Sequence, residues 1–88
     1  MEKNFICKTA DCAFMHLLEC RMYFVKMSAL NKFAKKHKIT QFGIISTKLY
    51  DHCRKQFSEY EKQLILEDKH TVEIITKLDN CINEYLLN

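Results

Sequence analysis

Proline is absent from this sequence, and its 88 residues include a single glycine, Gly43. Tight turns between β-strands are built largely from these two residue types, so a β-rich fold of this length would need several of them. Their near absence favours a few long helices joined by few connections. We therefore expect an all-α protein, a small three-helix antiparallel bundle with a long first helix, formed by residues 1–88 as a single domain.

Long apolar runs are missing as well. Only Phe5, Ile6 and Cys7 stand together before Lys8, whereas a secretory signal needs roughly 7–15 apolar residues. No segment approaches the roughly 20 apolar residues of a membrane-spanning helix. We expect a cytoplasmic protein that does not enter a membrane, with residues 1–9 as a leader before the first helix.

Motifs for catalysis are also few. A single glycine cannot build a phosphate-cradling loop. Asp51, His52 and Cys53 supply the residue types of a cysteine nucleophile site, but consecutive helical residues point about 100° apart and do not face each other. Cys53 also falls on an apolar row. The sequence therefore predicts a protein without enzymatic activity.

The five cysteines form no CxxC pair, and their number is odd. In a reducing compartment we expect them to act as small core residues. Cys12 and His16 lie one helical turn apart and could share a zinc ion, but Cys20 lies about 12 Å along the helix from Cys12. A closed site would need Cys7 or a cysteine from another helix, and we predict neither a metal nor a cofactor.

The most prominent feature of the sequence is a long amphipathic segment. Thr9 is a typical N-cap, and Asp11 follows in the first turn, where the helix dipole favours a negative charge. Two adjacent apolar rows then run toward Lys38. The rows consist of Ala13, Leu17, Cys20, Phe24, Met27, Leu30 and Ala34, and of Phe14, Leu18, Met22, Val25, Ala29 and Phe33.

A helix of residues 10–38 has more apolar surface than two shorter helices can cover. We therefore expect self-association into a homo-oligomer, with a second copy covering the exposed part of the first helix. The contact is predicted to involve Phe14, Leu18, Val25 and Phe33. The alternative is a break near Ser28, which would give a compact four-helix bundle.

Two further helices are predicted, at about residues 42–66 and 69–86. The first of them places Phe42, Ile45, Leu49, Cys53, Phe57, Tyr60 and Leu64 on one face. The second follows Asp68, which is a typical N-cap residue. Its apolar row is Val72, Ile75, Leu78 or Asp79, Ile82 and Leu86, and Ile74, Cys81 and Tyr85 widen it.

Charge is spread unevenly along the chain, although the net charge is only +3. Residues 1–38 hold eight Lys or Arg against three Asp or Glu, and residues 67–88 hold two against five. A basic patch at the end of the first predicted helix would steer an acidic partner. It consists of Lys32, Lys35, Lys36 and Lys38. Tyr23 and Tyr50 fall outside the predicted core rows and are candidates for exposed binding aromatics.

The segment 30–54 has some features of a DNA-binding helix-turn-helix. Ala34 falls near the position of the motif's small residue, and Thr40 falls near that of its cap. Ile39 and Ile44 fall near the positions of its two buried aliphatic residues. However, Lys38 occupies the turn position that favours glycine, and residues 41–48 contain few base-reading side chains. A basic nucleic-acid-binding regulator is therefore the alternative function, behind protein binding.

No motif identifies a substrate. Twelve lysines against two arginines are typical of an AT-rich genome, and phages and mobile elements often encode small helical proteins that block a host protein. The leading expectation is a non-enzymatic helical binding protein of this kind, which occupies a surface of another, unidentified protein.

Overall fold

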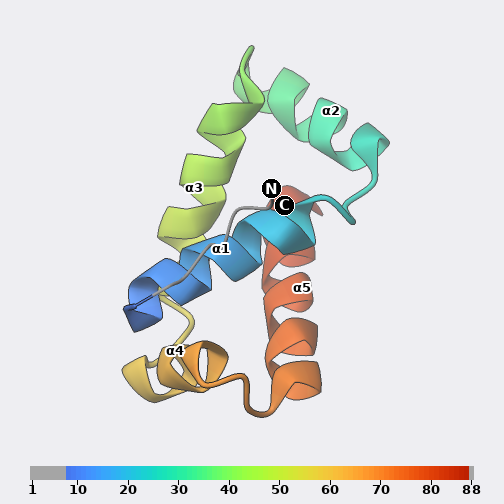
Figure 1. Cartoon of the computed structure of the whole chain (residues 1–88). Coiled ribbons are helices and arrows are strands. Elements are labelled where there is room, and N and C mark those ends of the chain that lie inside the picture. The colour runs from blue at the N-terminus through green and yellow to red at the C-terminus, as the bar shows by residue number, and fades with distance from the viewer. Residues whose placement is uncertain (1–7, 88) are drawn as a thin grey trace, which may run out of the picture.

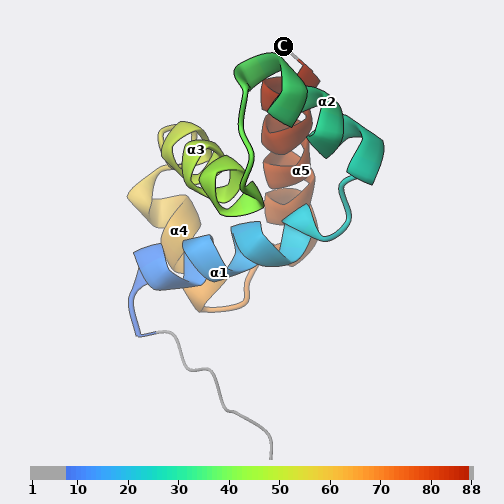
Figure 2. The same cartoon turned by 90° about the horizontal axis from the view of Figure 1, so that it is seen from above.

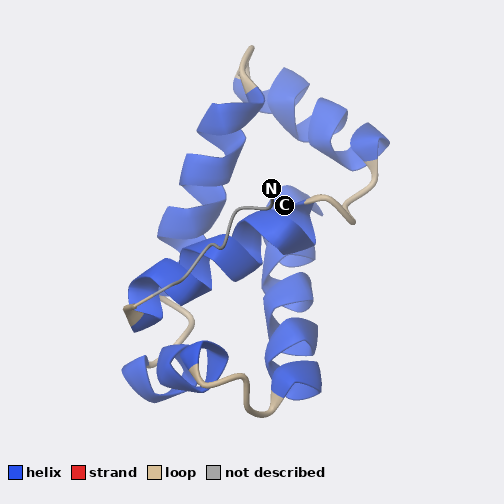
Figure 3. Cartoon of the chain, viewed as in Figure 1, coloured by secondary structure: helices blue, strands red, loops and turns tan. Residues whose placement is uncertain are grey.

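Residues 8–87, apart from the side chain of Phe42, are described by the computed structural model of this chain. Their regular structure is entirely helical (Figure 3). The helices are α1 (Ala10–Met22), α2 (Met27–His37), α3 (Phe42–Arg54), α4 (Glu59–Leu66) and α5 (Thr71–Leu87). The all-α class is thus confirmed, but the described residues form five helices where the sequence pattern predicts three. None of these helices combines the length and the apolar character needed to cross a membrane.

The predicted first helix of residues 10–38 is interrupted at residues 23–26, which separate α1 from α2. The end of α1 tightens, because the backbone N–H groups of Phe24 and Val25 donate to carbonyl oxygens three residues earlier. The prediction of one long helix is therefore wrong. The alternative, a break near Ser28, is close to what is found (Figure 1).

Tertiary packing accounts for this interruption. Lys26, the N-cap of α2, makes no side-chain capping hydrogen bond. The change of direction brings Leu30 and Phe33 into the core, where the Phe33 ring centroid lies 5.3 Å from that of Tyr85. Burying two such side chains is worth about 3–6 kcal/mol. That gain exceeds the net contribution of the few backbone hydrogen bonds lost, at about 1 kcal/mol each.

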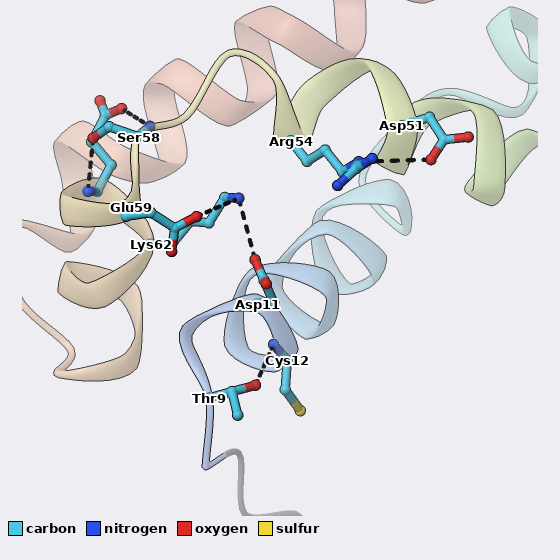
Figure 4. Close-up of polar contacts among 9 residues, drawn as sticks. Thr9, Asp11, Cys12, Asp51, Arg54, Ser58, Glu59 and Lys62 are labelled. Atoms are coloured by element: carbon cyan, nitrogen blue, oxygen red, sulfur yellow. Dashed lines mark hydrogen bonds and ion pairs between the residues drawn. The ribbon is translucent and has the colours of Figure 1, made fainter.

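The second predicted helix is also divided, at residues 55–58. Here the sequence does carry a local signal, a capping box at the start of α4. The backbone N–H of Ser58 donates to Glu61 Oε1 at 2.8 Å, and the backbone N–H of Glu61 donates to Ser58 Oγ at 3.1 Å (Figure 4). These two bonds satisfy donors that the first helical turn would otherwise leave unpaired.

Helix α5 is the centre of the fold and packs against each of the other four helices. Four residues at i, i+4 spacing form its buried row, namely Ile74, Leu78, Ile82 and Leu86. In both Figure 1 and Figure 2, α1 runs across α5 rather than alongside it. Helix α1 therefore crosses the central helix, and the described residues form a compact arrangement of five helices around α5 instead of the expected three.

Buried Lys62 joins α1 to α4. Its Nζ donates to Asp11 Oδ1 at 3.2 Å and to Glu59 Oε2 at 3.4 Å (Figure 4). Burial by itself lowers the pKa of Lys62, but the hydrogen bonds and charges of Asp11 and Glu59 outweigh it and raise the pKa above its ordinary value. Thr9 caps the same end of α1 as predicted, because its Oγ1 accepts a hydrogen bond from the Cys12 backbone N–H at 3.1 Å.

Among residues 8–87, three with side chains take the left-handed backbone conformation that glycine usually fills. Lys38, Asp68 and His70 have φ values of 56°, 59° and 54°. Lys38 ends α2, whereas Asp68 and His70 lie in the turn before α5. Helix α5 therefore begins at Thr71 and not at residue 69, and Asp68 accepts a hydrogen bond from the Thr71 hydroxyl at 3.2 Å.

Candidate functional site

Three of the four residues predicted to form a contact between two copies are buried in the core of one chain. Phe14, Leu18 and Phe33 belong to the buried core, and Val25 packs against its edge. The Phe14 ring, for example, lies 6.0 Å from the ring of Tyr50. Because Phe14, Leu18 and Phe33 pack within one chain, they are not exposed for the predicted contact with a second copy. A contact through Val25, and self-association itself, stay predictions.

The turn between α1 and α2 exposes a cluster of large side chains that we name the ridge, defined as Tyr23, Phe24 and Met27. Their exposed fractions are 87%, 73% and 57%. A continuous helix would have placed Phe24 and Met27 in one apolar row, but the interruption at residues 23–26 turns them outward. The Arg21 guanidinium lies 4.5 Å from the Phe24 ring centroid and supports one face of the ring.

Two hollows flank the ridge, and Val25 lines both of them. The first, which we name the methionine groove, has a volume of about 420 Å³. Helices α1, α2 and α3 all contribute to its lining, which includes Met22, Tyr23, Met27, Leu30, Gly43 and Ile45. The second, the α5 cleft, has a volume of about 340 Å³ and lies between the turn and the C-terminal half of α5. Its apolar lining includes Phe24, Ala29, Ile82, Leu86 and Leu87.

The four residues of the predicted basic patch are all exposed on α2 and its C-terminal cap. They are Lys32, Lys35, Lys36 and Lys38. Residues 20–50 contain seven Lys or Arg and no Asp or Glu, so this part of the chain carries no carboxylate to neutralise them. Helix α2, which carries the patch, begins at Met27 of the ridge, so a positive potential extends from one end of the apolar cluster.

The connection between α2 and α3 only partly matches a helix-turn-helix. Lys38 does adopt the left-handed conformation of the turn position that favours glycine. However, Ile44, which should be buried, is exposed, while Ile45 is fully buried. The apolar register of α3 is thus shifted by one residue from the motif. The exposed side of α3 also carries Asp51, 3.9 Å from Arg54 (Figure 4).

The residue types of a cysteine nucleophile site are adjacent in the sequence but diverge in the structure. Cys53 is fully buried, and burial, together with Cys81, raises the pKa of its thiol to about 12. His52 instead stacks on Tyr85, with ring centroids 4.6 Å apart, while Asp51 is exposed. The described geometry therefore does not activate Cys53 as a nucleophile.

Two of the possible metal ligands of α1 lie close together. Cys20 Sγ lies 3.9 Å from His16 Nε2, and Cys7 lies outside the described residues. Among residues 8–87, no group of three His, Cys, Asp or Glu side chains is arranged to hold a metal ion. That Cys7, Cys12 and His16 hold no metal therefore stays a prediction.

Tyr23 is exposed as the sequence predicts, whereas Tyr50 is half-buried against Phe14 and the Arg54 guanidinium lies 5.8 Å from its ring. Phe24 and Met27 are the candidate binding residues that sequence reasoning missed, because no local signal marks the interruption that exposes them. Comparison with protein-family models, curated proteins and solved structures finds no match to this chain. The ridge, the two hollows and the basic patch are therefore the features of this chain that bear on its function.

Proposed function

We propose that this chain is a non-enzymatic helical binding protein that occupies a surface of another protein through the ridge. The observation that carries the proposal is the exposure of three large side chains, Tyr23, Phe24 and Met27, where α1 ends and α2 begins. Aromatic residues and methionine are enriched in protein interfaces, and exposed apolar clusters with polar surroundings are typical of such sites. An inhibitor encoded by a phage or a mobile element would act in this way, by covering a functional surface of its target.

The basic patch is proposed to orient the partner. Lysines beside an apolar contact accelerate association with an acidic surface more than they increase the final affinity. Neutralising Lys32 and Lys35 should therefore slow association and reduce its dependence on salt. Changing the ridge should instead speed dissociation, because the buried apolar contact is lost.

The proposal is tested by affinity capture from cells of the source organism with three forms of the tagged chain. The wild-type chain and a Tyr60→Ser variant should retain the same partner, since Tyr60 is 70% exposed on α4, away from the ridge. A Tyr23→Ser/Phe24→Ser variant should lose it. Equal recovery with all three forms would exclude the ridge as the binding surface.

Nucleic-acid binding is the second candidate function, and the acid-free segment of residues 20–50 is the observation that favours it. Phosphate contacts by several lysines would give binding that weakens steeply as salt rises. The test is retardation of a DNA duplex at about 50 mM salt. Retardation that disappears when Lys35, Lys36 and Lys38 are neutralised would support this candidate, and no retardation would remove it.

A further inference from the structure

The α5 cleft beside the ridge combines an open apolar lining with one end that is basic. Phe24 and Leu87 are 73% and 77% exposed, and both line the cleft together with the apolar side chains of Val25, Ala29, Ile82 and Leu86. The volume of about 340 Å³ falls within the roughly 300–1,000 Å³ of pockets that bury a ligand. An apolar side chain seated here would remove this surface from water, which is favourable.

The charged groups that line the cleft are Arg21, Lys26 and Asp79. Arg21 and Asp79 hold each other through hydrogen bonds of 3.0 and 2.7 Å, so their charges offset one another. Lys26 forms no ion pair with another described residue. The described lining therefore has one positive charge in excess, and Lys26 carries it.

The start of α2 adds to this positive potential. Lys26 is the N-cap of α2 and Ala29 lies in its first turn, so the beginning of the helix borders the cleft. The first turn contains no acidic residue, and the N-cap makes no side-chain hydrogen bond. The positive end of the helix dipole therefore acts in the same direction as Lys26. A carboxylate of a ligand is favoured at this end of the cleft.

We propose that the α5 cleft anchors the partner protein, which inserts a large apolar side chain and places a neighbouring carboxylate beside Lys26. This inference rests on the proposed function and names the chemistry that the partner presents. A second copy joined through the same face is disfavoured, because residues 20–50 hold seven Lys or Arg and no Asp or Glu and would repel their own kind. The phosphate groups of a nucleic acid would gain nothing from the apolar lining.

Two charge-reversed variants separate the contact at Lys26 from general electrostatic attraction. Lys26→Glu reverses the charge in the cleft and should keep α2 folded, because an acidic residue at the start of a helix is favourable. Lys32→Glu changes the net charge by the same amount. Lys32 is exposed on α2 but lines neither hollow, so this variant is the matched control.

The probes are three short synthetic peptides with capped ends that share the same leucine residues. They differ in the residues beside the leucines, which are glutamate, glutamine or lysine. Each peptide is titrated into the full-length chain, and NMR of the methyl groups both measures the affinity and locates the contact. Ile82 and Leu87 line the α5 cleft, whereas Ile45 lines the methionine groove and serves as an internal control.

We expect the glutamate peptide to shift the methyl signals of Ile82 and Leu87 but not that of Ile45. It should bind about two- to fivefold more tightly than the glutamine peptide, which is the range of one exposed ion pair. The lysine peptide should bind least tightly. Lys26→Glu should reverse this order, whereas Lys32→Glu should preserve it.

The apolar part of the contact is tested by Leu87→Ser, which should weaken binding of all three peptides. Val72→Ser should leave binding unchanged, because Val72 is 75% exposed near the start of α5 and lies outside the cleft. Failure of the glutamate peptide to bind at about 1 mM would overturn the proposal. The same order of affinities in the wild type and in Lys26→Glu, or shifts at Ile45 alone, would overturn it too.

Other occupants give different signals and would also overturn the proposal. Leu87 shifts that grow with protein concentration alone would identify a second copy of the chain. Displacement of the glutamate peptide by a DNA duplex would identify a nucleic acid. If the peptides fail while the Tyr23→Ser/Phe24→Ser variant still loses the captured partner, the proposed function stands and only the inference about the α5 cleft fails.

Discussion

The guanidinium of Arg21 holds the carboxylate of Asp79 through two parallel hydrogen bonds. Nε donates to Oδ1 at 3.0 Å, and Nη2 donates to Oδ2 at 2.7 Å. Because Arg21 lies in the last turn of α1 and Asp79 in α5, the pair fixes the end of α1 against the central helix, directly before the ridge. The hydrogen bond from Arg21 to Asp79 also raises the pKa of the guanidinium above its ordinary value.

Replacing Arg21 with lysine tests whether this forked geometry positions the ridge. Lysine keeps the charge but cannot make two parallel hydrogen bonds to one carboxylate. We expect a lower melting temperature and faster amide hydrogen exchange at residues 23–26. Arg54→Lys is the matched control, because the Arg54–Asp51 pair is exposed and 3.9 Å long. Equal effects of the two substitutions would contradict a specific role for Arg21.

The different environments of Phe14 and Tyr23 predict opposite behaviour on truncation. Phe14→Ala should lower the free energy of unfolding by about 3–5 kcal/mol, because it leaves a cavity in the core. Tyr23→Ala should change it by less than about 0.5 kcal/mol, because the side chain is exposed. Chemical denaturation measures both values. A Phe14→Ala variant that stays fully stable but changes from oligomer to monomer would instead restore the self-contact expected from the sequence.

The sequence pattern predicts the face of α3 well and fails where the chain turns. The row Ile45, Leu49, Cys53 and Phe57 is buried as expected. Tyr60, the next member of that row, is exposed, because the interruption at residues 55–58 rotates α4 relative to α3. The Ser58–Glu61 capping box was a readable signal for this interruption. Helical periodicity alone did not reveal it.

The interruption before α2 carries no comparable signal. Residues 23–26 include no glycine, proline or side-chain cap, so the turn is decided by the burial of Leu30 and Phe33 elsewhere in the fold. Local sequence reasoning could not weigh that burial against helix continuity. The outward positions of Phe24 and Met27 were therefore not predictable. The fold class and the exposure of Tyr23 were, because they do not depend on where the helix breaks.

Lys38 predicts a stabilising substitution. Its φ of 56° is unfavourable for a residue with a side chain, so Lys38→Gly should raise the free energy of unfolding by about 0.5–1 kcal/mol. Lys35→Gly removes the same charge inside α2 and should lower that free energy by about 1 kcal/mol. Thermal unfolding of the two variants gives the comparison. Changes of the same sign would contradict the left-handed cap.

Glu61 makes the free energy of unfolding depend on pH in acidic solution. Burial acts to raise its pKa, but hydrogen bonds from Lys77 and the Ser58 backbone outweigh burial and hold the pKa below its ordinary value of 4.5. Its stabilising effect is therefore complete above pH 4.5 and is lost as the pH falls through the lowered pKa.

Glu61→Gln isolates the charge, because glutamine can also complete a capping box. The variant should lose at most about 1 kcal/mol at pH 7, since the pair with Lys77 is partly exposed, and should unfold like the wild type near pH 3. Denaturation curves across this range provide the measurement, with Glu84→Gln as a control. A constant difference between wild type and Glu61→Gln at every pH would contradict the assignment.

The central claim is that the ridge contacts a partner protein, and a photo-crosslinking amino acid placed at position 23 tests it most directly. The comparison position is 60, which is an exposed tyrosine of α4. After irradiation in cells of the source organism, we predict one discrete adduct between the position-23 variant and another protein, and no such adduct from position 60. Absence of an adduct from position 23, or the same adduct from both positions, would contradict the claim.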